Sequence, residues 1–325
     1  MPETRFFYHS FPRPRDGEPR ERQISRGLGI LRSIKQSGLI LAPEIVEWHT
    51  PVSIGSPSPT RLLQQRICFT ELTRDELNEH SRRFGSFAIE FDIVELRRAG
   101  ALPVMYIPQA LSKDDHLALI GSFVVSHLNH ILHTINQIHS IGQYRSPEYI
   151  ERHHGVTEIQ EDCEFNLRNV DSCGNIVQEF TIPWRSLRDF VDYIGFENAP
   201  FDAMTGAVSI AQSLFYPTDN KHIDEVLGYY RQREWRITAG YNVNGIPRGR
   251  PLVEDEKDAL LDADKHFWNR QLADGKETFL RLDKAAVLSE PNQNILRKMM
   301  SRLIVPTEVA DEVRKLFNDV AIDTI

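Results

Sequence analysis

Three segments that lie far apart in the chain carry the residue types needed to cleave an N-ribosyl bond. His9 ends an aromatic run near the N-terminus, Thr70 ends a second apolar run, and Gln232 and Glu234 open a third. Such a reaction uses hydrogen-bonding groups for the nucleotide, an aromatic ring for the departing base and a carboxylate beside the cationic sugar of the transition state. By spacing alone, a surface glutamate that pairs with an arginine is commoner than a catalytic glutamate. Glu234 is therefore open to both interpretations, as a catalytic carboxylate and as a member of a surface ion pair.

Five histidines could form a metal site on a long helix. Apolar residues recur at steps of three and four over residues 112–141, which predicts one amphipathic helix. This segment contains His116, His127, His130, His133 and His139. Three of them are spaced by three residues, but successive steps of this length drift by about 60° around a helix, and no carboxylate or cysteine follows at the next turn. We expect no metal site there, and a metal-dependent nuclease is kept as an alternative.

Motifs of several enzyme classes are absent from the sequence. The chain has no GxSxG, GxGxxG or GxxxxGK[ST], which excludes the common nucleophile-elbow, Rossmann and P-loop signatures. Its cysteines, Cys68, Cys163 and Cys173, form no CxxC pair, so reduced thiols are expected. Cys68 lies in an apolar run, where a buried, inert thiol is the usual outcome.

The charge of the chain is acidic overall but unevenly distributed. The 325 residues carry a formal net charge of −8, which argues against a protein coated in nucleic acid. Residues 1–35 and 231–250 are basic, and the second stretch holds five arginines against Glu234 alone. These arginines could neutralise a pyrophosphate or steer an RNA or DNA strand. We expect no membrane span and a cytoplasmic location, because no apolar run is long enough to cross a bilayer.

The elements that must position these residues are short and alternate between strand and helix. The patterns predict strands at 5–11, 67–71, 85–91, 102–107, 233–240 and 303–306, and a hairpin at 163–182. They predict helices at about 24–34, 255–272, 291–302 and 307–319, and a capping box between Thr73 and Glu76. Residues 51–60 are rich in Pro, Ser and Gly, which is typical of a surface loop. We therefore expect an α+β fold.

This fold is expected to form a single domain over residues 1–325. A helical insertion is expected at about 111–160 and a helical C-terminal region at about 254–325. The apolar stripe of helix 112–141 would pack against the core or support self-association.

Two segments, residues 66–108 and 229–237, resemble the AbiGi-type abortive phage infection family. The resemblance lies in a Cys-Phe strand, a helical histidine, an aromatic-Gly pair, a Pro-Val-x-Tyr strand and a Glu-Trp-Arg ending: Cys68, Phe69, His80, Phe84, Gly85, Pro103, Val104, Tyr106, Glu234, Trp235 and Arg236. These motifs occur in the order in which the family has them. The resemblance implies a component of a phage-defence or toxin–antitoxin system.

The wider pattern is similar to the ADP-ribosyltransferase fold, with a mixed β core, peripheral helices and here a long helical insertion. In that fold a His or Arg, a hydroxyl and a Gln/Glu-x-Glu motif surround NAD. The resemblance implies that His9 holds the adenosine-side ribose and Thr70 supports the nicotinamide half. It implies that Gln232 orients the acceptor and that Glu234 holds the nicotinamide ribose and stabilises the oxocarbenium ion.

The ring-stacking role has several candidates in this pattern: Tyr8, Phe69 and Tyr106. The chain has Cys68-Phe69-Thr70 where the commoner form has a Ser-Thr-Ser triplet. The resemblance to the ADP-ribosyltransferase fold implies NAD as the cofactor, consumed as a substrate.

Two hypotheses about function follow. The first is a toxin that transfers ADP-ribose from NAD to a macromolecular acceptor, nucleic acid or protein, and is restrained by a cognate antitoxin. The second is a non-catalytic antitoxin or binding module that restrains a toxin partner. Glu234 beside basic stretches favours catalysis, because a binding module has no need for a carboxylate amid arginines.

Overall fold

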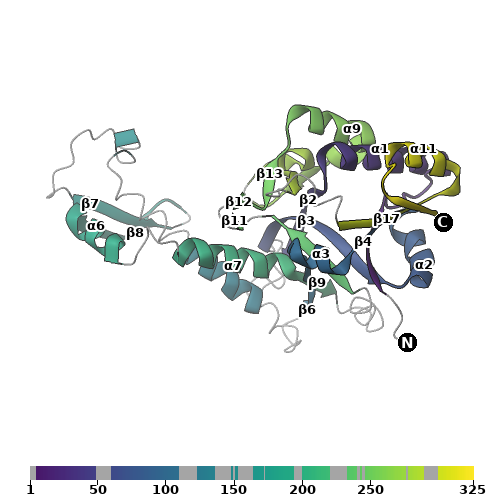
Figure 1. Ribbon diagram of the computed structural model, residues 1–325. Coiled ribbons are helices and arrows are strands. Elements are labelled where there is room, and N and C mark those ends of the chain that lie inside the picture. The colour runs from purple at the N-terminus through teal and green to yellow at the C-terminus, as the bar shows by residue number, and fades with distance from the viewer. Residues whose placement is uncertain are drawn as a thin grey trace. The chain divides into compact units, whose positions relative to one another are not determined.

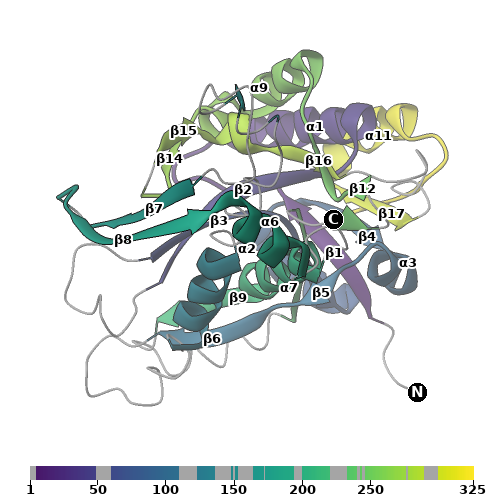
Figure 2. The same ribbon diagram turned by 90° about the vertical axis from the view of Figure 1, so that its left-hand side faces the viewer.

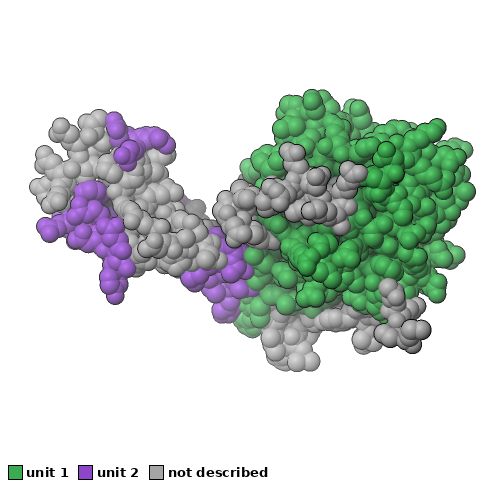
Figure 3. Space-filling view, viewed as in Figure 1, with its two compact units in different colours: residues 1–126, 210–325 green, residues 127–209 purple. Residues whose placement is uncertain are grey.

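The structure is a computed structural model, and most of the chain is described in it. The described residues are 5–48, 60–109, 123–135, 148, 151–152, 164–171, 173–193, 200–219, 233–239, 242–243, 246–275, 277–288 and 299–325. Contacts between residues divide the chain into two compact units, coloured separately in Figure 3. Unit 1 comprises residues 1–126 and 210–325, and unit 2 comprises residues 127–209.

Unit 1 is built on a ten-stranded mixed sheet. Its strands run in the order β13 (Gly249–Pro251), β16 (Ala286–Leu288), β2 (Ile40–Trp48), β3 (Thr60–Leu72), β1 (Phe6–Phe11), β4 (Phe87–Phe91), β17 (Met300–Val305) and β18 (Ala321–Thr324). β10 (Glu234–Thr238) pairs with both β3 and β5 (Leu102–Pro103). The pairs are antiparallel except for β17 with β18.

Helices and a strand pair cover this sheet. The helices of unit 1 are α1 (Arg20–Ser37), α2 (Arg74–Phe84), α3 (Ile93–Arg98), α9 (Glu254–Trp268) and α11 (Ala310–Leu316), with short 3₁₀ turns η3 (Arg281–Lys284) and η4 (Thr307–Val309). The parallel pair of β6 (Met105–Gln109) and β9 (Phe215–Asp219) lies on the side of the sheet away from α1, as Figures 1 and 2 show. Smaller pairs are β14 (Gln271–Ala273) with β15 (Thr278–Leu280), and β11 (Asn242–Val243) with β12 (Ile246–Pro247).

The main core lies between the sheet and α1. Phe69, Phe87 and Phe91 are completely buried there. α1 approaches the sheet closely at Gly27, where a Cβ atom would stand 2.2 Å from the Phe87 ring. Any larger residue would force this helix away from the core.

Unit 2 contains an antiparallel hairpin followed by a helix. β7 (Glu164–Val170) pairs with β8 (Ile176–Pro183), and α6 (Trp184–Tyr193) follows. α7 (Pro200–Leu214) begins in unit 2 and ends in unit 1. A helix over residues 123–135 also spans the boundary between the units.

Several predictions from sequence are confirmed by this fold. The chain is α+β, with a mixed sheet and helices, and the hairpin at 163–182 is present as β7 and β8. The capping box is formed, because Thr73 Oγ1 accepts from Glu76 N and the Glu76 carboxylate accepts from Thr73 N. Apart from these confirmed predictions, the described part of the chain contains no helix that is long and apolar enough to cross a membrane.

Other predictions are wrong or lie outside the described residues. The C-terminal region 254–325 is not mainly helical, because β16, β17 and β18 complete the main sheet from this region. Residues 300–302, predicted to end a helix, begin β17 instead, since pairing with β4 overrides the local pattern. Residues 291–298 of that prediction lie outside the described residues. Of helix 112–141 only residues 123–135 are described, so self-association through it stays a prediction. The loop at 51–60 lies outside the described residues up to Thr60, where β3 begins.

Candidate functional site

The register between β3 and its neighbours groups five polar or titratable residues on one face of the sheet. Glu234 pairs with Thr70, and Arg236 pairs with Cys68. Tyr8 of β1 also pairs with Thr70. Because directly paired residues of antiparallel strands share a face, these side chains belong to the same face. Residues at odd positions of β3, such as Phe69, belong to the opposite face.

The carboxylate of Glu234 is held on both of its oxygens. The hydroxyl of Tyr106 donates to Oε2 at 2.6 Å, and Nε of Arg236 donates to Oε1 at 2.9 Å. The side chain of Glu234 is 15% exposed and that of Arg236 only 1% exposed. The carboxylate is therefore fixed in orientation while part of it still reaches the surface.

A second layer holds Arg236 in place. Its guanidinium lies over the ring of Tyr216, 4.9 Å from the centroid, and donates to the carbonyl of Ser213 at 3.4 Å. Arg66 lies over the same ring at 5.3 Å and forms an ion pair with Glu44. Tyr216 thus lies in contact with two cations.

The electrostatics keep Glu234 charged at neutral pH. Burial, the largest single influence, would raise the pKa of Glu234, but the charge of Arg236 and hydrogen bonds from Cys68, Tyr106 and Arg236 outweigh it and lower this pKa. Burial and the neighbouring Glu234 raise the pKa of the Cys68 thiol to about 12. Cys68 is therefore a hydrogen-bonding thiol and no nucleophile at neutral pH.

His9 and Phe69 are not brought together with Glu234. His9 pairs with Ile89 of the buried core, and its Nδ1 lies 2.8 Å from the carbonyl oxygen of Cys68. Its ring lies 6.1 Å from the ring of Phe69. Burial lowers the pKa of His9, so the ring is neutral. The predicted grouping of His9 and Phe69 with Glu234 is corrected here, because strand alternation sends these residues to the other face.

Of the other predicted site residues, two lie beside Glu234 and one lies outside the described residues. Thr70 and Tyr106 lie beside Glu234, as the sequence predicts, whereas Gln232 lies outside the described residues. Arg233 precedes Glu234 with a left-handed backbone (φ 45°), which non-glycine residues rarely adopt. Its guanidinium donates to the carboxylate of Glu76 at 2.7 Å. Arg233 and Arg236 therefore pair with different glutamates.

Sequence reasoning missed Arg66, Tyr216 and Glu44 as neighbours of this site. A signal for Arg66 exists in β3, where Arg66, Cys68 and Thr70 alternate with Ile67 and Phe69. Such a period of two predicts one polar face on an otherwise buried strand. Tyr216 and Glu44 carry no such signal, since their positions depend on β9 and β2.

No metal site is found in the described residues, where no three His, Cys, Asp or Glu side chains cluster suitably. The rings of His127 and His130 are 6.4 Å apart, while His116 and His139 lie outside the described residues.

Comparison with known proteins finds no matching family, no similar curated protein and no similar solved structure. The site itself offers an ionised, oriented carboxylate that can stabilise a nearby positive charge.

Proposed function

We propose that this chain is an ADP-ribosyltransferase-like toxin of a phage-defence or toxin–antitoxin system, which transfers ADP-ribose from NAD to a macromolecular acceptor. The observation that carries the proposal is Glu234, an ionised carboxylate that two donors orient at the start of β10. The resemblance of residues 66–108 and 229–237 to the AbiGi-type family supports a role in phage defence or in a toxin–antitoxin system.

The proposed chemistry needs a stable negative charge. When the bond between nicotinamide and the ribose C1′ breaks, its electron pair leaves with nicotinamide and the ribose becomes cationic. A carboxylate in a site shielded from water stabilises that cation more than one in bulk solvent does. The acceptor then bonds to C1′ and loses a proton.

The donors on Glu234 leave room for a ribose hydroxyl. A carboxylate can accept about four hydrogen bonds, and Tyr106, Arg236 and Cys68 each donate one. The exposed part of Glu234 can therefore accept from the substrate while its orientation is kept. Tyr106, whose hydroxyl contacts this carboxylate, is the aromatic ring best placed to lie against nicotinamide, in preference to Phe69 on the opposite face.

One observation favours the second candidate, a non-catalytic antitoxin or binding module. A carboxylate with both oxygens bound by protein donors is also what a buried structural ion pair looks like. In that case Glu234 and Arg236 serve only to join β10 to the β6–β9 pair.

Incubation of the purified protein with NAD labelled in its adenylate phosphate, together with cell extract, separates the candidates. We expect covalent label in one class of macromolecule and faster release of nicotinamide with extract than without, since water substitutes poorly for a positioned nucleophile. Expression of the chain alone should be toxic. Harmless expression together with no nicotinamide release above a buffer blank would favour the binding module.

A further inference from the structure

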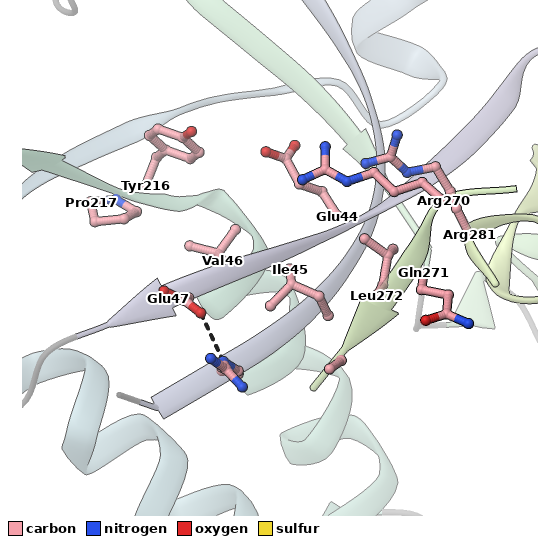
Figure 4. Close-up of a pocket in the computed structure, with 12 residues that line it drawn as sticks. Glu44, Ile45, Val46, Glu47, Tyr216, Pro217, Arg270, Gln271, Leu272 and Arg281 are labelled. Carbon is pink, nitrogen blue, oxygen red and sulfur yellow. Dashed lines mark hydrogen bonds and ion pairs between the residues drawn. The ribbon is translucent and has the colours of Figure 1, made fainter. Parts of the chain in front are cut away.

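A pocket of about 550 Å³ opens beside β2, β9 and the β14–β15 hairpin in unit 1. Figure 4 shows its lining, which includes the apolar side chains of Val46 and Leu272 and the ring of Tyr216. Two arginines, Arg270 and Arg281, complete one wall. The volume lies within the range of about 300–1,000 Å³ typical of small-molecule sites.

The two arginines are opposite one another at the end of the hairpin. Gln271 pairs with Leu280, and the N–H of Arg281 donates to the carbonyl of Arg270 at 2.9 Å. Figure 4 shows the two guanidinium groups side by side. Burial and, after it, the charge of Arg270 lower the pKa of Arg281. Like charges directly across a strand pair destabilise the fold, so this arrangement needs a counter-charge.

Nearby carboxylates supply only part of that counter-charge, because the charges of Glu44 and Asp264 raise the pKa of Arg281 but do not outweigh burial and Arg270. Glu44 forms its ion pair with Arg66, and Glu47 pairs with Arg61 at 2.8 Å, the dashed line in Figure 4. Among the described residues neither Arg270 nor Arg281 forms an ion pair with a carboxylate.

Arg281 has donor capacity that the protein leaves unused. Its side chain is 7% exposed, and its Nε has no hydrogen-bond partner among the described residues. The same guanidinium lies 4.1 Å from the centre of the Phe267 ring and makes one long hydrogen bond of 3.4 Å to the Phe267 carbonyl. A buried guanidinium with an unused donor is costly unless an acceptor arrives.

We propose that this pocket binds a nucleotide, with a phosphate between Arg270 and Arg281 and the base against the apolar wall of Val46, Leu272 and Tyr216. Two adjacent guanidinium forks match the oxygens of a phosphate and would cancel its charge. Neither arginine takes part in the contacts of Glu234, so the proposal does not depend on the transferase assignment.

The test measures binding of AMP and of inorganic phosphate to the full-length protein by calorimetry, in phosphate-free buffer. We expect AMP to bind at least tenfold more tightly than inorganic phosphate, and Arg270→Gln to weaken both at least tenfold. Arg314→Gln serves as the control, because Arg314 is an exposed arginine paired with Asp311. It should bind both ligands as the parent does.

Thermal unfolding gives an independent readout. Without ligand, Arg270→Gln should melt at a higher temperature than the parent, because the like-charge contact is relieved. With AMP, the parent and Arg314→Gln should gain more stability than Arg270→Gln. Equal affinity for AMP and inorganic phosphate would overturn the nucleotide assignment. Unchanged binding in Arg270→Gln, or no binding of either ligand, would overturn the site altogether.

Discussion

The two faces of the central sheet are made from alternate residues of the same strands, yet they differ in chemistry. Around Phe69 the face toward α1 is a core of aromatic and aliphatic side chains. Around Cys68 and Thr70 the opposite face carries the Glu234–Arg236 ion pair. That face continues to Glu90, which is 2% exposed and accepts from Tyr8 at 2.8 Å.

The comparison of the two faces shows that the apolar face mainly stabilises the fold, whereas the charged face holds the groups that could do chemistry. The apolar face gains free energy from burial alone and tolerates no unpaired polar group. The opposite face keeps buried charges, which need partners in fixed places and so are oriented before any ligand arrives. Four predictions test this contrast, starting with the largest expected effect.

Phe69→Ala should be among the most destabilising single changes on the apolar face. Loss of a fully buried phenyl ring typically lowers the free energy of unfolding by about 3–5 kcal/mol. Thr70→Ala, one residue along on the other face, should cost less than about 1 kcal/mol. Urea denaturation of both variants measures this difference. Equal losses would contradict the division of β3 into two faces.

Arg236→Met should destabilise the polar face by about 3 kcal/mol, because it leaves the charge of Glu234 buried and unpaired. The double variant Arg236→Met, Glu234→Leu should recover most of that loss, since it removes both charges. Denaturation of the single and double variants checks this. A double variant as unstable as the single one would mean that packing, not charge, dominates at Arg236.

The two faces should respond to acid in different pH windows. His9 has a folded-state pKa below 6.5, so the unfolded chain binds its proton first and stability falls as the pH drops below about 6.5. Glu234 has a folded-state pKa below 4.5, so its contribution is present above 4.5 and is lost only as the pH falls through that lower value.

His9→Phe should therefore reduce the loss of stability between pH 7 and 5, and Glu234→Gln should reduce it only at lower pH. Thermal unfolding from pH 7 down to about pH 3 is the measurement, so that both windows are covered. His80, whose pKa burial lowers to about 4, remains in both variants and accounts for the residual slope. A His9→Phe profile that matches the parent between pH 7 and 5 would count against a buried neutral His9.

The smallest expected effect concerns thiol reactivity. Cys68 has a pKa raised to about 12, whereas Cys173 is exposed in the β7–β8 turn. Iodoacetamide at pH 8 should modify Cys173 first, and peptide mass spectrometry can follow both sites. Glu234→Gln should speed modification of Cys68, because one cause of its raised pKa is removed. Equal rates at the two cysteines would contradict this environment.

Much of the local structure could be predicted from sequence, whereas the long-range pairing could not. Periodicity located α1, β1, β10 and the hairpin, and Thr73 with Glu76 marked the start of α2. β2 carried no usable signal, because Pro43 argues against a strand in the middle of a sheet. β4 lies within the strand predicted at 85–91, but the sequence alone does not show that all five of its residues are buried between β1 and β17.

The candidate site shows the same limit. Glu234, Thr70 and Tyr106 were found from residue type and resemblance, and they do lie together. The spacing of His9 says nothing about the registers of β1 and β10 against β3, which decide the side chains that share a face. The sequence does not predict that Arg270 and Arg281 lie close together, because their proximity depends on the pairing of the short strands β14 and β15.

The proposed transferase is tested most directly by the rate of nicotinamide release from NAD with Glu234→Gln. Gln keeps the shape of the side chain but loses its charge and one acceptor oxygen, so turnover should fall about a hundredfold or more in protein that thermal unfolding shows to be folded. Glu76→Gln is the matched control, because Glu76 also pairs with an arginine, Arg233, but is more exposed. It should keep parental turnover. A folded Glu234→Gln protein that releases nicotinamide as fast as the parent would contradict the account.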